Sequence, residues 1–181
     1  MLESLITSKT RIKLLLKFFL NSANTSYLRD LSAEFGESTN AIRLELNHLE
    51  KAGLLNSKTA GNKKIFQANR KHPLFSDINK LLLKHTGIDH VVEAVVTNLG
   101  GLHSAYVTGS FARGHDNPVI ELLLVGTDID REYLVHLVDK AENIISRSIR
   151  YNIVTREETA ALLHNNPEAL LLWKKNDIQP Q

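Results

Sequence analysis

Five polar residues near the start of one amphipathic stretch, residues 38–52, have side chains that can hydrogen-bond to nucleic acid. They lie off its apolar stripe and are Ser38, Thr39, Asn40, Arg43 and Asn47. The N-terminal part of a helix can enter the major groove of DNA, where such side chains read the donors and acceptors of base edges. Three lysines follow, and their charges suit contacts with the adjacent phosphate backbone: Lys58, Lys63 and Lys64.

The composition is that of a globular protein with an uneven distribution of charge. The 181 residues include no cysteine, which excludes a disulfide framework and cysteine-ligated metal centres. Residues 1–72 carry 12 Lys and Arg against 6 Asp and Glu, whereas residues 73–181 carry 10 against 14. The basic part predicts binding to a polyanion, with chance segregation of solvated charges as the alternative. Further candidates for phosphate contacts are Arg11, Lys13 and Arg29.

The early apolar segment from Ile12 to Leu20 does not have the features of a targeting sequence. It contains Lys13 and Lys17 and is followed by no small-residue cleavage site. We therefore expect neither a signal peptide nor a membrane span, and we expect a cytoplasmic protein.

Residues 1–72 have the elements of a winged helix-turn-helix domain. Helical periodicity predicts three helices, at residues 9–20, 27–36 and 38–52. Two short strands, 54–57 and 64–68, would form a hairpin around Gly61 and Asn62. Leu44 lies off the buried stripe of the third helix, where it could contact a thymine methyl group or pack on the hairpin.

Residues 73–181 divide into a connecting helix and a small α/β unit. Pro73 opens a helical pattern that ends near Gly87, so the connecting helix spans 73–87. Helices and strands then alternate over 88–181, which is typical of an α/β fold. Strands are predicted at 103–108, 119–125 and 149–154. Helices are predicted at 88–99 and 130–146, followed by two short helical pieces that end at Trp173-Lys174-Lys175.

Three segments resemble known families. Residues 38–55, STNAIRLELNHLEKAGLL, resemble the recognition helix and following turn of ArsR-like and MarR-like winged-helix transcriptional regulators. Residues 65–75, IFQANRKHPLF, and 106–114, YVTGSFARG, resemble regulators in which an ArsR-like domain is fused to a nucleotidyltransferase-like domain. The resemblance implies a homodimer that binds double-stranded DNA, often with the first helix at the dimer interface.

The first helix has extra apolar surface at Leu14 and Phe18 that needs a partner. That surface would suit the dimer interface implied by the resemblance. The alternative is that the helix is sandwiched within its own domain.

The resemblance also implies a nucleotidyltransferase-like fold for residues 88–181, with a Gly-Ser turn that holds nucleotide phosphates. Gly109 and Ser110 match that turn. Catalysis in that superfamily needs two acids at an i, i+2 spacing on the next strand and a third on a later strand, which together hold Mg²⁺ ions. Val119 and Glu121 occupy the first two positions, and residues 148–155 contain no Asp or Glu. We therefore expect no catalytic residues, no bound metal and no cofactor.

Other residues do not complete a metal site. Asp116 lies too close to Gly114, and Asp130 is expected to be the N-cap of the following helix. The eight histidines form no His-x-His or His-x3-His pair, so we expect them to be scattered rather than to sense a metal.

The Gly-Ser turn could still bind a ligand without metal. Gly109, Ser110 and Arg113 are suited to an anion, so a nucleotide or another anionic effector could bind there. The alternative is a turn that is kept only because the fold needs its glycines.

The leading hypothesis is a DNA-binding transcriptional regulator in three parts. They are a winged helix-turn-helix domain at 1–72, the connecting helix at 73–87 and a non-catalytic nucleotidyltransferase-like domain at 88–181. The fold class is mixed α+β and α/β. The alternative is an active Mg-dependent nucleotidyltransferase that modifies a protein or small molecule and uses the winged domain for recognition. A third alternative is a protein-interaction adaptor with neither activity.

Overall fold

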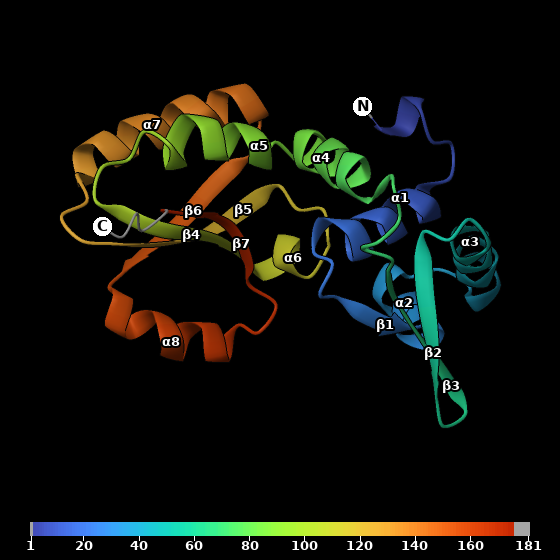
Figure 1. Cartoon of the computed structure of the whole chain (residues 1–181). Helices are drawn as coiled ribbons and strands as arrows, with labels where there is room; N and C mark the ends of the chain where they lie inside the picture. The colour runs from blue at the N-terminus through green and yellow to red at the C-terminus, as the bar shows by residue number, and fades with distance from the viewer. Residues whose placement is uncertain (1, 176–181) are drawn as a thin grey trace. The chain divides into compact units, whose positions relative to one another are not determined.

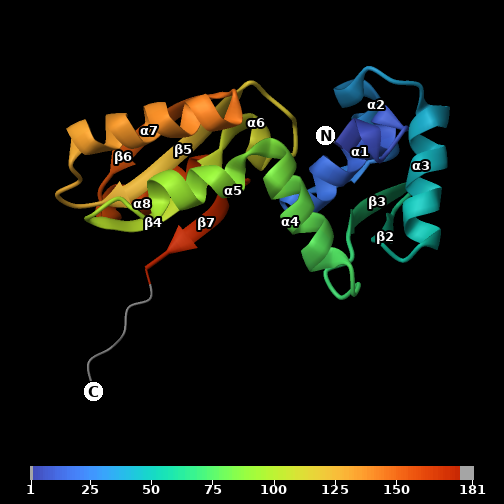
Figure 2. The same ribbon diagram turned by 90° about the horizontal axis from the view of Figure 1, so that it is seen from above.

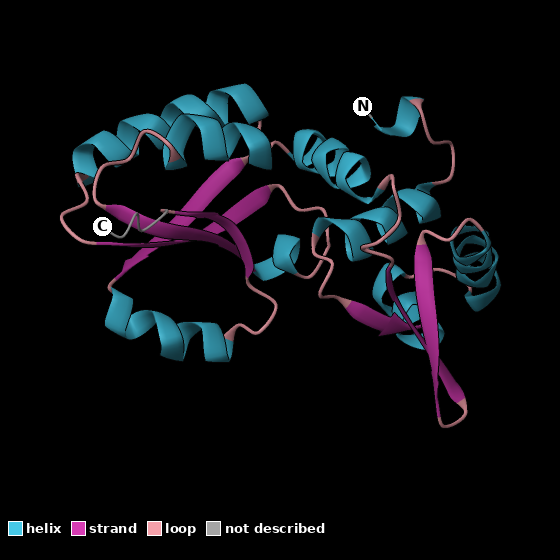
Figure 3. Ribbon diagram, viewed as in Figure 1, coloured by secondary structure: helices cyan, strands magenta, loops and turns pink. Residues whose placement is uncertain are grey.

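The computed structural model describes residues 2–175 and has a mixed α and β fold with two separate β-sheets (Figure 3). The chain divides into two compact units. The first contains the residues up to His85 together with Arg113–Asp116, and the second contains Thr86–Ala112 and the residues from Asn117 onward. The helix that follows Pro73 thus groups with the first unit. Among the described residues, no helix is both long and apolar enough to cross a membrane.

The first unit combines helices with a small antiparallel sheet (Figure 1). Its helices are η1 (Leu2–Ser4), α1 (Lys9–Leu15), the π-helical turn η2 (Leu16–Leu20), α2 (Leu28–Phe35), α3 (Thr39–Lys51) and α4 (Phe75–Thr86). Its strands are β1 (Thr25–Tyr27), β2 (Leu55–Ala60) and β3 (Lys63–Ala68). Strand β3 lies between β1 and β2 and is antiparallel to both. The expected hairpin is present, with longer strands than predicted, and β1 adds a strand that the sequence did not indicate.

Local signals in the sequence explain where α2 and α3 end and begin. Gly36 closes α2 in the left-handed conformation, with φ +64°. Ser38 then caps α3, because its Oγ accepts a hydrogen bond from the backbone N–H of Ala41 at 3.2 Å. The predicted bounds of α3 are therefore confirmed.

The extra apolar surface of the first helix is covered within the chain. Leu14 and Phe18 are both 0% exposed in the single chain. Of the two alternatives, the sandwiched helix is correct, and these two residues give no support to a dimer interface.

The second unit is a four-stranded sheet with helices on both faces (Figure 1). Its strands are β4 (Leu102–Thr108), β5 (Val119–Gly126), β6 (Ser148–Val154) and β7 (Leu170–Lys174), in the order β6-β5-β4-β7. Its helices are α5 (Ile88–Val91), η3 (Val92–Val96), α6 (Gly109–Ala112), α7 (Arg131–Ile145) and α8 (Arg156–Asn165). Strand β5 is parallel to β6, and β4 is antiparallel to β5 and β7. Figure 2 shows α5 and α7 side by side on one face, and α8 covers the other.

The prediction of a second short helix before Lys175 is wrong. Residues 170–174 form β7, which pairs with β4 from Val107↔Leu170 to Ser104↔Lys174. A short apolar run such as Leu170 to Trp173 fits a helix or a strand equally well. Pairing decides, because without β7 the backbone groups along one side of β4 would lack hydrogen-bond partners.

Glu45 makes the stability of the first unit depend on pH. Burial opposes its ionisation, but hydrogen bonds from Ser8 and Arg11 and the charge of Arg11 outweigh burial and lower the pKa of the carboxyl group below 4.5. A carboxyl whose pKa is lower in the folded than in the unfolded state stabilises the fold above the unfolded pKa, and this contribution disappears as the pH falls through the folded pKa.

We therefore expect the loss of stability in Glu45→Gln to be largest near neutral pH. The difference from the wild type should shrink as the pH falls below about 4.5, where the carboxyl of the unfolded chain takes up a proton, and it should disappear as the pH falls through the lower pKa of the folded carboxyl. Urea denaturation followed by circular dichroism over a pH series measures this. A difference that stays constant over the whole series would contradict the prediction.

Candidate nucleic-acid interface

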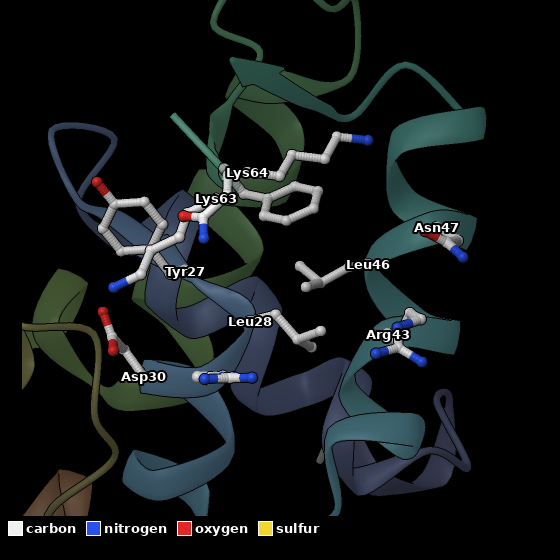
Figure 4. Close-up of a pocket in the computed structure, with 11 residues that line it drawn as sticks. Tyr27, Leu28, Asp30, Arg43, Leu46, Asn47, Lys63 and Lys64 are labelled. Carbon is white, nitrogen blue, oxygen red and sulfur yellow. The ribbon is translucent and has the colours of Figure 1, made fainter. Parts of the chain in front are cut away.

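An open hollow of about 440 Å³ lies in the first unit between α3, the start of α2 and strand β3 (Figure 4). Charged and amide residues line it from three elements: Arg43 and Asn47 of α3, Lys63 and Lys64 of β3, and Arg29 and Asp30 of α2. The apolar side chains of Leu28 and Leu46 lie between them. The structure therefore brings four of the eight residues predicted on α3 and the hairpin together around one concave surface.

The periodicity of α3 determines which of its residues are exposed. Ile42, Leu46 and Leu49 are buried on one side. Asn40, Arg43 and Asn47 are exposed, and their i, i+3, i+7 spacing places them along one face of the helix. A ligand can therefore reach this row of polar side chains.

Leu44 is 54% exposed, beside the row of polar residues on α3. It is therefore not packed on the hairpin, which was one of the two alternatives. A large exposed aliphatic side chain next to polar groups is available for contact with an apolar group of a partner.

The other predicted residues at the start of α3 do not line the hollow. Ser38, Thr39 and Asn40 are exposed at the N-terminal end of the helix. The Ser38 oxygen has a structural role as the helix cap.

The side chains of Lys58, Lys63 and Lys64 project from two different faces of the hairpin. Side chains alternate along a strand, so Lys63 and Lys64 project from opposite faces of β3. Lys58 pairs with Ile65 in the register of β2 and β3, so it shares the face of Lys63, and it does not line the hollow. A single phosphate backbone along one face would therefore meet Lys58 and Lys63, not all three.

Lys64 has a carboxylate partner of its own. Its Nζ lies 2.7 Å from Glu50 Oε2 and 5.2 Å from the centroid of the Phe66 ring. Hydrogen bonds from Lys64 and Ser57 lower the pKa of Glu50, so this carboxylate is ionised at neutral pH. Lys63 instead lies over an aromatic ring, with Nζ 5.5 Å from the centroid of Tyr27.

Two of the further candidate cations are engaged within the fold. Arg11 Nε lies 2.8 Å from Glu45 Oε2, and Lys13 Nζ lies 2.6 Å from Glu37 Oε1. These pairs attach α1 to α3 and to the segment before α3. Arg29, in contrast, lines the hollow.

Sequence reasoning missed several residues that line the hollow, namely Tyr27, Asp30 and Asn62. Asn62 could have been found, because it directly precedes Lys63 in the predicted turn. Tyr27 ends β1 and Asp30 lies in the first turn of α2, and both come close to the hairpin only in the folded unit.

The Gly-Ser turn of the second unit has a carboxylate against it. Gly109 begins α6 with φ +63°, and a Cβ at this position would lie 2.2 Å from Glu121 Oε1. Ser110 Oγ accepts a hydrogen bond from Asn117 Nδ2 at 3.3 Å. Arg113 is exposed after the end of α6. The negative charge of Glu121 therefore lies beside the backbone where an anion was expected.

The strand positions of the implied metal ligands carry other residues. Val119 and Glu121 share one face of β5, and their partners on β6 are Ser148 and Arg150. A guanidinium thus stands beside Glu121 in the sheet register. Within residues 2–175, no cluster of three or more His, Asp or Glu residues could hold a metal ion. Asp130 is the N-cap of α7 as predicted, accepting from the Tyr133 N–H at 2.9 Å.

Comparisons with known proteins find similarity only at the level of solved structures. No family model matches the chain, and no curated protein matches it. Reduced HlyU from Vibrio cholerae N16961 is 18% identical over 46% of this chain and 82% of that chain, with a TM-score of 0.37. A mutant of the toxin-antitoxin MntA-HpeT is 19% identical over 49% and 73%, with a TM-score of 0.37. A protein from Sulfolobus solfataricus assigned as a nucleotidyltransferase is 21% identical over 56% and 90%, with a TM-score of 0.37. At these values the similarities assign neither a family nor an activity to the chain.

Proposed function

We propose that the chain is a DNA-binding transcriptional regulator whose first unit is a winged helix-turn-helix. The observation that carries the proposal is the hollow that Arg43 and Asn47 of α3 share with Lys63 and Lys64 of β3. In this proposal α3 enters the major groove of DNA, and the β2–β3 hairpin lies against the neighbouring sugar-phosphate backbone.

The exposed row on α3 has the chemistry for reading bases. Arg43 suits a bidentate contact with guanine, and the amides of Asn40 and Asn47 suit adenine. Leu44 suits the methyl group of a thymine. Lys58 and Lys63 would contact phosphates and so position the protein without reading sequence.

The direct test is capture of genomic duplex fragments by the purified full-length chain, followed by anisotropy titrations with the recovered sequences. We expect affinity to fall by roughly 10-fold or more between about 50 and about 200 mM salt, because phosphate contacts release counterions. Failure to capture any duplex at low salt would refute the proposal and favour a protein-interaction adaptor.

Charge reduction at Glu50 offers a gain-of-affinity prediction. Glu50→Gln removes a negative charge from α3, the helix proposed to enter the groove, so DNA is repelled less and we expect duplex binding to strengthen by roughly 2- to 5-fold. Anisotropy titration at low salt measures the change. Glu93→Gln, which removes an exposed carboxylate in the second unit, is the matched control and should leave affinity unchanged. Unchanged or weaker binding by Glu50→Gln would contradict an approach of DNA to α3.

We also propose that the second unit does not transfer nucleotides. The support is that Val119 stands at the first implied ligand position, Glu121 at the second, and residues 148–155 of the later strand contain no Asp or Glu. Two hard cations require more oxygen ligands than one carboxylate supplies. Incubation with labelled nucleotide and Mg²⁺ or Mn²⁺ tests this. Label transfer that is abolished by Glu121→Ala would establish the alternative, an active nucleotidyltransferase.

A further inference from the structure

The hollow of the first unit contains one side chain whose charge does not suit contact with phosphates. Among the described residues that line it, Asp30 is the one carboxylate, and it lies in the first turn of α2. Figure 4 shows Asp30 on the side of Tyr27 and Lys63, across the hollow from Arg43 and Asn47. A ligand in the hollow therefore meets Asp30 and Arg43 from two different sides.

The fold does not use the Asp30 carboxylate in an ion pair. Asp30 is exposed, and it has no hydrogen-bond or ion-pair partner within residues 2–175, although Arg29 and Arg43 line the same hollow. Glu50, in contrast, holds Lys64 Nζ at 2.7 Å from its Oε2. Asp30 is therefore available to a ligand without the loss of an internal contact.

The position of Asp30 in α2 has a structural use that a test must separate from ligand binding. Asp30 is the third residue of the helix Leu28–Phe35, where a negative charge interacts favourably with the helix dipole. Asp77 is the third residue of α4, Phe75–Thr86, and is also exposed, but it does not line the hollow. The two carboxylates thus share the position at a helix start and differ in their relation to the hollow.

The chemistry of a carboxylate limits what it can contact on DNA. An ionised carboxylate accepts hydrogen bonds and donates none, and phosphates repel it. In the major groove its partner is an exocyclic amino group. Cytosine presents the N4 amino group there, whereas adenine presents N6 next to the acceptor N7, which repels a carboxylate. A carboxylate on a DNA-binding surface therefore favours sequences that place a cytosine against it and opposes the others.

We propose that Asp30 is a specificity-determining residue that accepts a hydrogen bond from the N4 amino group of a cytosine. This inference rests on the proposed DNA-binding function and names one base of the bound sequence. Arg43, on the other side of the hollow, favours guanine by donating hydrogen bonds. Asp30 adds an acceptor, and its charge weakens binding to every sequence that lacks a cytosine at that position.

Anisotropy titrations of the full-length chain test this role, with the captured duplex, its single-base-pair variants and a duplex of unrelated sequence. Asp30→Ala should reduce discrimination at one C·G pair by roughly 10-fold, because the acceptor for N4 is lost. The same variant should bind the unrelated duplex roughly 2- to 5-fold more tightly, because a negative charge is removed. Asp77→Ala removes the carboxylate at the same position of another helix in the first unit and should discriminate like the wild type.

The possible results separate this inference from the DNA-binding proposal. Discrimination that is unchanged in Asp30→Ala at every base pair, or lost at an A·T pair instead, would overturn the inference while leaving DNA binding in place. An equal gain of affinity for all sequences would also overturn it, because Asp30 would then only repel phosphates. The same loss of discrimination in Asp77→Ala would assign the effect to helix stability. A wild-type chain that binds no duplex would refute both proposals.

Discussion

Arg43→Ala should weaken binding to the captured duplex by roughly 10- to 100-fold. This loss corresponds to the binding free energy of about 1–3 kcal/mol that is expected for a bidentate contact with a base. Arg43 is exposed, lines the hollow and has no ion-pair partner among residues 2–175. Its guanidinium is therefore available to a ligand without breaking an internal contact. Anisotropy titration against the captured site and its single-base variants measures the effect.

How the loss of affinity in Arg43→Ala varies between DNA sequences is as informative as the size of the loss. A base contact predicts that Arg43→Ala loses affinity for one preferred sequence and discriminates less at one base pair. Lys58→Ala should instead weaken all sequences alike and reduce the salt dependence by about one counterion. Arg70→Ala removes another exposed arginine that lies outside the hollow and serves as the control. A uniform loss in Arg43→Ala would reassign this residue to the phosphate backbone, and no loss would exclude α3 as the reading helix.

Gly101→Ala should destabilise the second unit. Gly101 has φ +76°, and a Cβ there would lie 2.1 Å from the backbone oxygen of Thr127. The left-handed conformation costs a non-glycine residue about 1–2 kcal/mol, and a clash with a backbone atom adds about 1–3 kcal/mol. The displaced segment also carries the Thr127 N–H that donates to the Gly101 oxygen at 3.0 Å. We therefore expect the free energy of unfolding to fall by about 3 kcal/mol, measured by urea denaturation.

The neighbouring glycine provides a close control. A Cβ at Gly100 would meet no atom within 4 Å, and the backbone there is not in the left-handed region. Gly100→Ala should therefore change stability by less than about 1 kcal/mol, and a small gain is expected because alanine restricts the unfolded chain. Equal effects at the two positions would show that the approach of Thr127 to Gly101 does not constrain the fold.

The parts of the fold that follow from local signals were predictable from the sequence. Helix α3 has a Ser38 cap and a clear apolar stripe, and both its bounds and its exposed row were found. Strands β1 and β7 were missed because they depend on distant partners, Thr25 with Gln67 and Leu170 with Val107. A run of three to five residues carries too little periodicity to reveal such a partner.

The candidate site was likewise predictable only where local sequence patterns determine it. Periodicity identified Arg43 and Asn47, but the directions of Lys58 and Lys63 depend on the strand register. The pairing of Arg11 with Glu45 depends on how α1 packs on α3, and the sequence does not encode this in any nearby pattern. Charge counts therefore overestimated how many cations of the first unit are available to a ligand.

The position of β7 has a consequence for how the second unit forms. This strand is synthesised after every other strand of its sheet, yet it pairs along β4. Until it docks, β4 presents an open edge with the apolar residues Ala105 and Val107 alongside. Open apolar edges recruit strands from other molecules, so a nascent or shortened chain that lacks residues 170–174 is expected to self-associate.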